Sequence, residues 1–90
     1  MNRNQYAMTT VTIYTTPTCT YCRATKEFFK KHNVSFQEVD AAADRKAAQM
    51  IVEKTGQLGV PVTIITKDDK EEVVLGFDQP KLADILGVSL

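Results

Sequence analysis

Residues 8–22 read M-T-T-V-T-I-Y-T-T-P-T-C-T-Y-C. The β-branched residues up to Thr15 alternate between two faces, as they do in a strand. Pro17 cannot donate a hydrogen bond to a neighbouring strand, so a turn follows. Beyond the turn, apolar and aromatic residues recur at steps of three and four, which is the period of an amphipathic helix. This stretch therefore places a Cys-x-x-Cys motif, Cys19 to Cys22, where a strand ends and a helix begins.

The remaining sequence continues the alternation of strand and helix patterns. The chain is predicted to form strands over residues 8–15, 34–40, 62–66 and 71–75, and helices over residues 20–32, 45–55 and 81–86. The first strand-helix-strand unit predicts a right-handed parallel crossover, and the short turn between the last two strands makes them antiparallel neighbours. We therefore expect an α/β fold in the order βαβαββα, with a four-stranded mixed sheet flanked by three helices.

Apolar patterns also predict which faces are buried. The run V-T-I-I-T at 62–66 is typical of a strand buried on both faces. The inner stripe of the second helix is predicted to be Ala47, Met50, Ile51 and Lys54. The inner residues of the last helix are predicted to be Leu82, Ile85 and Leu86.

Length and composition indicate one folded domain. The chain has 90 residues, of which 43% are hydrophobic and 24% are charged, close to the average for globular domains. A chain of this size supports one core and not two. We expect residues 8–90 to form a single domain and residues 1–7 to be a flexible N-terminal segment.

The charge balance and the lack of long apolar runs limit the partners. Eleven Lys and Arg residues balance eleven Asp and Glu residues, and a net charge of zero argues against nucleic acid as the main partner. No apolar run approaches the roughly 18 to 20 residues that cross a bilayer, and residues 1–10 contain no apolar signal segment. We expect a cytoplasmic protein that binds neither nucleic acid nor membranes. Because no long apolar stripe is left exposed once the core is assigned, we expect a monomer.

The two cysteines are better explained by chemistry than by stability. A bridge between Cys19 and Cys22 closes a very short loop, which stabilises little, and the cytoplasm keeps thiols reduced. A helix N-terminus offers free backbone N–H groups and the positive end of the helix dipole, so we expect the pKa of Cys19 to be lowered. Cys22 lies one helical turn further on, where it can bond to the first sulfur but is less exposed. The pattern predicts an attacking thiolate at Cys19 and a resolving thiol at Cys22.

Other interpretations of the motif need different surroundings. A closed zinc site has four ligands, and the single histidine, His32, lies about 15 Å away along the predicted helix. We therefore predict no metal ligands within one chain, although two copies sharing zinc or an iron-sulfur cluster stay open as an alternative. Purely structural cysteines, or a binding adaptor without the chemistry, are disfavoured because both cysteines lie at a helix start.

Five residues besides the two cysteines attract attention. Val60-Pro61 opens a buried strand, either as a simple strand start or as a cis bond that turns the Val60 backbone outward to pair with an extended substrate. Tyr21 is predicted to be a surface aromatic residue beside a substrate groove. Lys26, about two turns past the first cysteine, could favour its thiolate a little. We expect His32 to be only a cation at the helix C-terminus.

Three motifs together resemble the glutaredoxin-like branch of the thioredoxin superfamily. They are Y-T-T-P-T-C-T-Y-C (14–22), G-Q-L-G-V-P-V-T (56–63) and V-L-G-F-D (74–78). The resemblance covers nearly the whole chain, from residue 8 to residue 86. It implies a thioredoxin fold and thiol-disulfide oxidoreductase activity with no cofactor in the catalytic step. It also implies that Cys19 is the nucleophile, that Cys22 resolves, and that Pro61 is a cis-proline facing both.

The motifs depart from the glutathione-dependent pattern. Thr16 occupies a place where such proteins usually carry lysine, and Leu75 replaces the first glycine of the last motif. Asp78 is in place to meet a ligand's amino group, and the Val60 backbone can still pair with a cysteinyl group. The resemblance thus implies a weakened glutathione site, in which the substrate-binding residues are Thr16, Tyr21, Val60, Pro61, Gly76, Phe77 and Asp78.

The same comparison leaves two electron sources open. The Gly76-Phe77 pair is similar to that of the redoxin that supplies ribonucleotide reductase and is itself reduced by thioredoxin reductase. The bulky Phe77 side chain is expected to narrow the groove. The resemblance therefore implies protein disulfides or glutathione mixed disulfides as substrates, and glutathione or thioredoxin reductase as the reductant.

Overall fold

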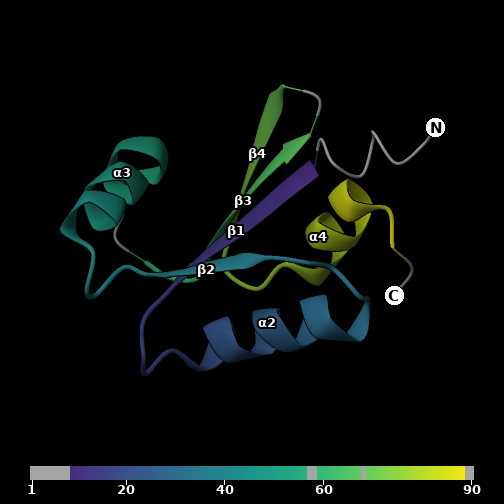
Figure 1. Ribbon diagram of the computed structural model, residues 1–90, viewed down its shortest axis with the longest axis horizontal. Coiled ribbons are helices and arrows are strands. Elements are labelled where there is room, and N and C mark those ends of the chain that lie inside the picture. The colour runs from purple at the N-terminus through teal and green to yellow at the C-terminus, as the bar shows by residue number, and fades with distance from the viewer. Residues whose placement is uncertain (1–8, 57–58, 68, 89–90) are drawn as a thin grey trace.

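The computed structural model describes residues 9–56, 59–67 and 69–88. Within them the elements follow the predicted order (Figure 1). They are β1 (Thr9–Thr15), α2 (Thr20–Lys31), β2 (Gln37–Asp40), α3 (Arg45–Thr55), β3 (Val62–Lys67), β4 (Lys70–Leu75) and α4 (Gln79–Leu86). The predicted flexible segment, residues 1–7, lies outside the described residues.

The sheet confirms the predicted α/β class. Its strand order is β2-β1-β3-β4, with β2 parallel to β1 and with β3 antiparallel to both β1 and β4. Strand β1 is therefore central, because it pairs with β2 through Thr12 to Thr15 and with β3 through Thr9 to Tyr14. As predicted, β3 is buried on both faces over its first four residues.

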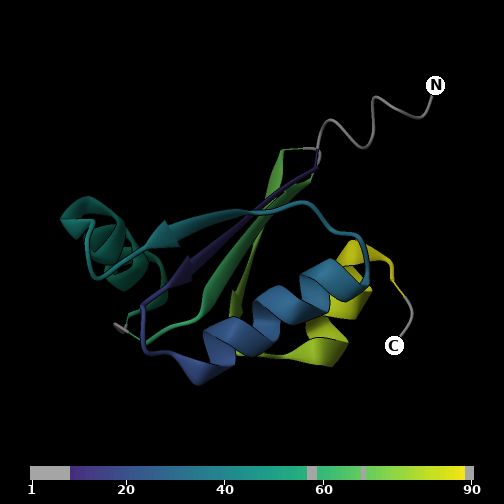
Figure 2. The same ribbon diagram turned by 60° about the horizontal axis from the view of Figure 1, so that its bottom comes forward.

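The helices cover the two faces of the sheet, and each face has its own apolar core (Figures 1 and 2). On one face, α2 and α4 enclose a cluster of buried residues comprising Val11, Ile13, Phe28, Phe29, Ile65, Val74, Leu82 and Ala83. On the other face, Ile51 of α3 packs with Val62 and Ile64. The alternation of side chains along β3 sends its residues into both cores, which is why this strand has no exposed face.

Two element boundaries differ from the predicted ones by more than one residue. Strand β2 begins at Gln37 because the preceding residues complete the end of α2, where the backbone N–H of Val34 donates to the carbonyl oxygen of Phe29 at 2.8 Å. Helix α4 begins two residues early because the Asp78 side chain accepts a hydrogen bond from the backbone of Lys81. Pro80 is tolerated there, since the first helical turn needs no N–H from it.

The predicted apolar stripe of α3 is wrong at Lys54, whereas that of α4 is confirmed and gains one residue. Lys54 is exposed and pairs with Glu71 at 2.7 Å, so the inner face of α3 consists of Ala47 and Ile51 with partly buried Met50. In α4, Leu82 is buried and Ile85 and Leu86 pack against the same core, as predicted, and Ala83 is buried as well. None of the helices in the described ranges is long and apolar enough to cross a membrane.

Phe29 provides a test of the larger core. Its side chain is fully buried, and its ring centroid lies 5.3 Å from that of Phe36. We expect Phe29→Ala to lower the free energy of unfolding by about 3–5 kcal/mol, because it removes apolar contacts and leaves a cavity. Val52→Ala, at a side chain that is 39% exposed, is the control and should change it by about 0.5 kcal/mol or less. Urea unfolding followed by circular dichroism measures both, and equal effects would contradict this assignment of the core.

Candidate active site

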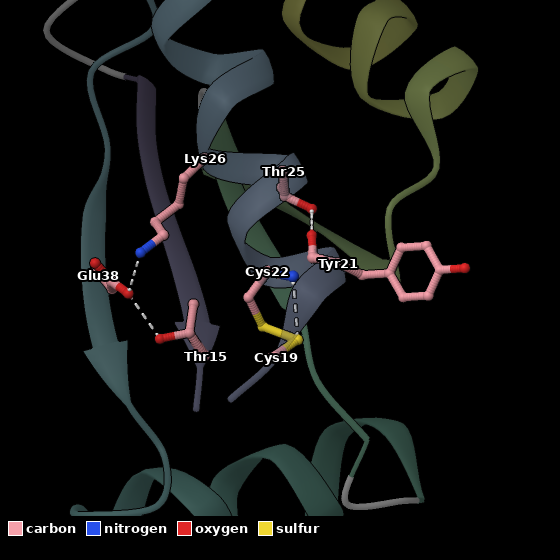
Figure 3. The surroundings of a disulfide bond; sticks show 7 residues. All are labelled: Thr15, Cys19, Tyr21, Cys22, Thr25, Lys26 and Glu38. Atoms are coloured by element: carbon pink, nitrogen blue, oxygen red, sulfur yellow. Dashed lines mark hydrogen bonds and ion pairs between the residues drawn. A yellow bond between two sulfur atoms is a disulfide. The ribbon is translucent and has the colours of Figure 1, made fainter. Parts of the chain in front are cut away.

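Cys19 and Cys22 form a disulfide at the start of α2, immediately after the central strand (Figure 3). Cys19 is the N-cap residue, with an extended backbone (φ −87°, ψ 113°), and its Sγ accepts a hydrogen bond of 3.0 Å from the backbone N–H of Cys22. The sulfur thus takes the place of the oxygen that usually caps a helix. In the reduced protein, the same N–H and the helix dipole favour negative charge on this sulfur.

The two cysteine residues differ in exposure. Cys22 is 2% exposed and lies in the protein interior, whereas Cys19 is only half-buried. The Cα atoms are 5.2 Å apart, which is within the usual range for a bridge. An external disulfide can therefore reach Cys19 far more easily than Cys22.

The loop before β3 lies at the same end of the sheet as the motif, where β1 ends and β3 begins. Tyr14 pairs with Val62, so the chain that leaves β1 passes the chain that enters β3 (Figure 2). The Val60-Pro61 bond is cis, and Val60 lies outside the ladder, whose first paired residue is Val62. The sequence left open whether Val60-Pro61 is a simple strand start or a cis bond, and the structure has the cis bond.

The loop between β4 and α4 is tied to that proline. The backbone N–H of Gly76 donates to the carbonyl oxygen of Pro61 at 2.9 Å, and Gly76 adopts φ 73°, which a residue without a side chain reaches at little cost. Asp78, another predicted site residue, is exposed. Its side chain caps α4 by accepting a hydrogen bond from the backbone N–H of Lys81. The structure thus joins Pro61 and Gly76 directly and shows Asp78 as a helix cap, while its contact with an amino group stays a prediction.

The aromatic residues of the predicted site lie on the α4 side of α2. Tyr21 is 67% exposed and points away from β2 (Figure 3), as expected of a surface residue beside the motif. The ring of Phe77 lies edge-on to Phe28, with centroids 6.1 Å apart, and both line a groove of about 370 Å³. Phe77 therefore packs beside the middle of α2, two turns beyond the disulfide. His32 caps the C-terminus of this helix, and its ring lies 4.6 Å from that of Phe28.

A polar hollow on the opposite side of α2 was not anticipated from the sequence. It has a volume of about 130 Å³, and both cysteines line it together with Thr15, Thr16, Lys26 and Glu38. Glu38 Oε2 accepts hydrogen bonds from Thr15 Oγ1 at 2.8 Å and from Lys26 Nζ at 2.9 Å (Figure 3). The sequence signalled Lys26 weakly and Glu38 not at all, because the register of β2 on β1 decides which residue meets the lysine.

The hydrogen bond from Lys26, followed by that from Thr15, lowers the pKa of Glu38 below its ordinary value of 4.5. The carboxylate is therefore ionised at neutral pH. As for metal sites, in the described part of the chain no three His, Cys, Asp or Glu side chains gather closely enough to hold an ion.

Comparison with known proteins identifies the family. The glutaredoxin family model matches residues 11–70, which include the Cys-x-x-Cys motif and Pro61. A glutaredoxin-like 8.6 kDa protein from the rubredoxin operon of Clostridium pasteurianum is 33% identical over 76 residues, covering 84% of this chain and 96% of the relative. The chain belongs to the glutaredoxin family.

Solved structures confirm the thioredoxin fold. The thioredoxin-like protein BC3987 superposes with a TM-score of 0.72 at 33% identity, over 83% of this chain and 97% of that one. NrdH-redoxin from Escherichia coli, a glutaredoxin-like protein with a thioredoxin-like activity profile, gives 0.70 at 26% identity, over 89% and 97% of the two chains. The resemblance seen in the three motifs is thus confirmed at the level of family and fold.

The Glu38 interactions predict an acid-sensitive contribution to stability. Because the folded pKa of Glu38 is depressed, its contribution is present above pH 4.5 and is lost as the pH falls through the folded pKa. The side chain is 40% exposed, so we expect the effect to be less than about 1 kcal/mol.

Glu38→Gln should flatten the fall in melting temperature below about pH 4.5. Lys26→Gln should flatten it similarly, because the lysine bond is the larger cause of the shift. Thermal unfolding measured from neutral to acid pH tests this, and an unchanged pH dependence in both variants contradicts it.

Proposed function

We propose that this protein is a thiol-disulfide oxidoreductase that reduces disulfides of other proteins, or mixed disulfides with glutathione, in the cytoplasm. The observation that supports this most strongly is the unequal exposure of the two cysteines at the start of α2, with Cys19 half-buried and capping the helix and Cys22 buried. This is the arrangement that an attacking and a resolving thiol require. Membership of the glutaredoxin family supports the same chemistry.

The proposed cycle begins with the reduced dithiol. The Cys19 thiolate attacks a substrate disulfide, forms a mixed disulfide and releases the first substrate thiolate. The Cys22 thiol then loses its proton, its sulfur bonds to Cys19, and the second substrate sulfur leaves as a thiolate that takes up a proton. The protein is left in the disulfide form seen here, and a reductant regenerates the dithiol.

The neighbouring loops supply the proposed substrate contacts. The backbone of Val60, next to the cis bond and outside the ladder, can pair with an extended substrate. Pro61 and Gly76, joined by their hydrogen bond, are the proposed contacts beside Val60, and the exposed Tyr21 side chain is the proposed contact on α2. Thr16 lines the hollow at the motif, and Asp78 is the proposed contact for an amino group.

The reductant we propose is thioredoxin reductase, with glutathione as the slower alternative. Two departures from the glutathione-dependent pattern favour this order, Thr16 in the place of the usual lysine and Leu75 in the place of the first glycine of the last motif. NrdH-redoxin is among the similar solved structures. A role as an iron-sulfur carrier is disfavoured, because the bond between Cys22 and Cys19 competes with cluster ligation by Cys19.

The two cysteine roles are tested by single substitutions. Cys22→Ser should leave a mixed disulfide on Cys19 that mass spectrometry detects after incubation with a disulfide substrate, because no thiol remains to resolve it. Cys19→Ser should abolish turnover and accumulate no adduct, since Cys22 is buried. Equal and partial losses of activity in both variants would contradict these roles.

The electron source is tested by following NADPH consumption with each reducing system in parallel. We expect turnover with thioredoxin reductase to exceed turnover with glutathione and its reductase by roughly tenfold, a difference of about 1.4 kcal/mol in transition-state stabilisation. Phe77→Ala should narrow that ratio, because it removes a bulky ring from the loop that Gly76 bonds to Pro61, and Val52→Ala, at an exposed side chain of α3, is the control. Faster turnover with glutathione would contradict the order and would show that Val60, Gly76 and Asp78 suffice without the lysine.

A further inference from the structure

Two hollows lie on different sides of helix α2. The groove on the α4 side is lined by Ala24, Phe28 and Phe77 and by polar side chains, and it contains neither cysteine. The polar hollow on the β2 side is lined by both cysteines and by the Thr15, Lys26 and Glu38 side chains. Figure 3 shows these three residues on one side of the disulfide and Tyr21 on the other. The polar hollow therefore reaches the cysteines from the side away from Tyr21, and Thr16 is the one proposed substrate contact that lines it.

Three elements fix the charge in this hollow. Thr15 at the end of β1 and Lys26 on α2 donate to the same oxygen of Glu38, which lies on β2. Thr15 is buried, so its hydroxyl holds the carboxylate from below the surface. The Lys26 ammonium is consequently anchored beside the cysteines instead of extending into solvent.

The other charged groups that face the hollow are Arg23 on α2 and Asp40 on β2. Arg23 is exposed, and Asp40 Oδ1 accepts a hydrogen bond from the backbone N–H of Ala42 in the following turn. Among the described residues that line the hollow, Lys26 and Glu38 are thus the charged pair bonded to each other and to the strand that leads into the motif.

The resolving step needs the thiolate form of Cys22, which is a buried residue. Cys22 is almost fully buried, and burial disfavours a thiolate relative to a thiol. A positive charge close to the sulfur opposes that effect. The hollow is lined by Cys22 and holds such a charge at Lys26.

We propose that Lys26, anchored by Glu38 and Thr15, is a positioning residue for the resolving step, and that its ammonium favours the thiolate of Cys22. In this step the Cys22 thiol releases its proton to solvent water in the hollow, and the thiolate electron pair forms the bond to Cys19 Sγ. The bond between Cys19 and the substrate sulfur breaks, and that sulfur leaves with the electron pair and is protonated. The inference rests on the proposed function, since it assigns the role of these residues within it.

According to the proposal, the Lys26 ammonium and the Glu38 carboxylate shift the ionisation of Cys22 in opposite directions. Removing the ammonium in Lys26→Gln leaves the Glu38 carboxylate facing the sulfurs and disfavours the thiolate. Removing the carboxylate charge in Glu38→Gln leaves the ammonium uncompensated and favours the thiolate. A purely structural role in holding β2 on α2 predicts no such opposition, because both substitutions break the same 2.9 Å contact.

The test uses Cys19→Ser, in which Cys22 is the sole cysteine of the chain and serine, a good N-cap residue, replaces the first sulfur. The ultraviolet absorbance of the thiolate is measured against pH in the full-length protein. We expect Lys26→Gln to reduce the ratio of thiolate to thiol at a given pH by roughly three- to tenfold. Glu38→Gln should raise the ratio of thiolate to thiol. Lys26→Arg keeps the positive charge, so its ratio should lie close to that of the protein with Lys26.

A matched control is the other ion pair of the described residues. Lys54 bonds to Glu71 at 2.7 Å, with side-chain exposures of 35% and 43% compared with 28% and 40% for Lys26 and Glu38. Lys54 lies on α3 and does not line the hollow, so Lys54→Gln should leave the ratio unchanged. Circular dichroism spectra of all variants establish that they are folded.

The proposal is overturned if Lys26→Gln and Glu38→Gln shift the ratio in the same direction, or if neither shift exceeds that of Lys54→Gln. Failure of the proposed function is a separate result. In that case the protein with both cysteines reduces no disulfide substrate, whatever the ionisation of Cys22. Opposite shifts, together with turnover that slows in Lys26→Gln at the resolving step, support both.

Discussion

The hydrogen bond from the backbone N–H of Cys22 to the sulfur of Cys19 joins the fold of this protein to its chemistry. A helix needs an acceptor for its first N–H groups, and here a cysteine sulfur is that acceptor. The same contact turns the sulfur toward the positive end of the helix and places the second cysteine one turn inside. Capping, unequal exposure and the proposed division of labour between the two thiols therefore have a common origin.

This helix start is held in place by the sheet. Strand β1 is central, so the chain that leaves it emerges between β2 and β3. Its antiparallel partner β3 brings the Val60-Pro61 loop to the same edge, and the hydrogen bond from Gly76 to Pro61 adds the loop that precedes α4. Its parallel partner β2 brings Glu38 to the other side of α2. The Val60-Pro61 loop and the Lys26–Glu38 pair thus lie on two different sides of the start of α2.

Much of the fold could be predicted because its patterns are local. The alternation before Thr15, the proline after it and the helical spacing that follows predict the strand-turn-helix unit. The short turn between the last two strands makes them antiparallel neighbours. The misassigned positions lie where a tertiary contact competes with a local pattern. Val34 completes the end of α2 instead of extending β2, and Lys54 pairs with Glu71 at the surface instead of facing the core.

The sequence by itself determined the two cysteines, their spacing and their position at a helix start, because capping and helical period act over only a few residues. It also determined the order of strands and helices and, through three motifs, the family. Only the tertiary structure decided which side chains share the polar hollow with the sulfurs. Thr15, Lys26 and Glu38 are separated by 11 and 12 residues along the chain, and no local rule relates them. They meet because β2 lies parallel to β1 in one particular register, in which Ile13 is paired with Glu38 and Thr15 with Asp40.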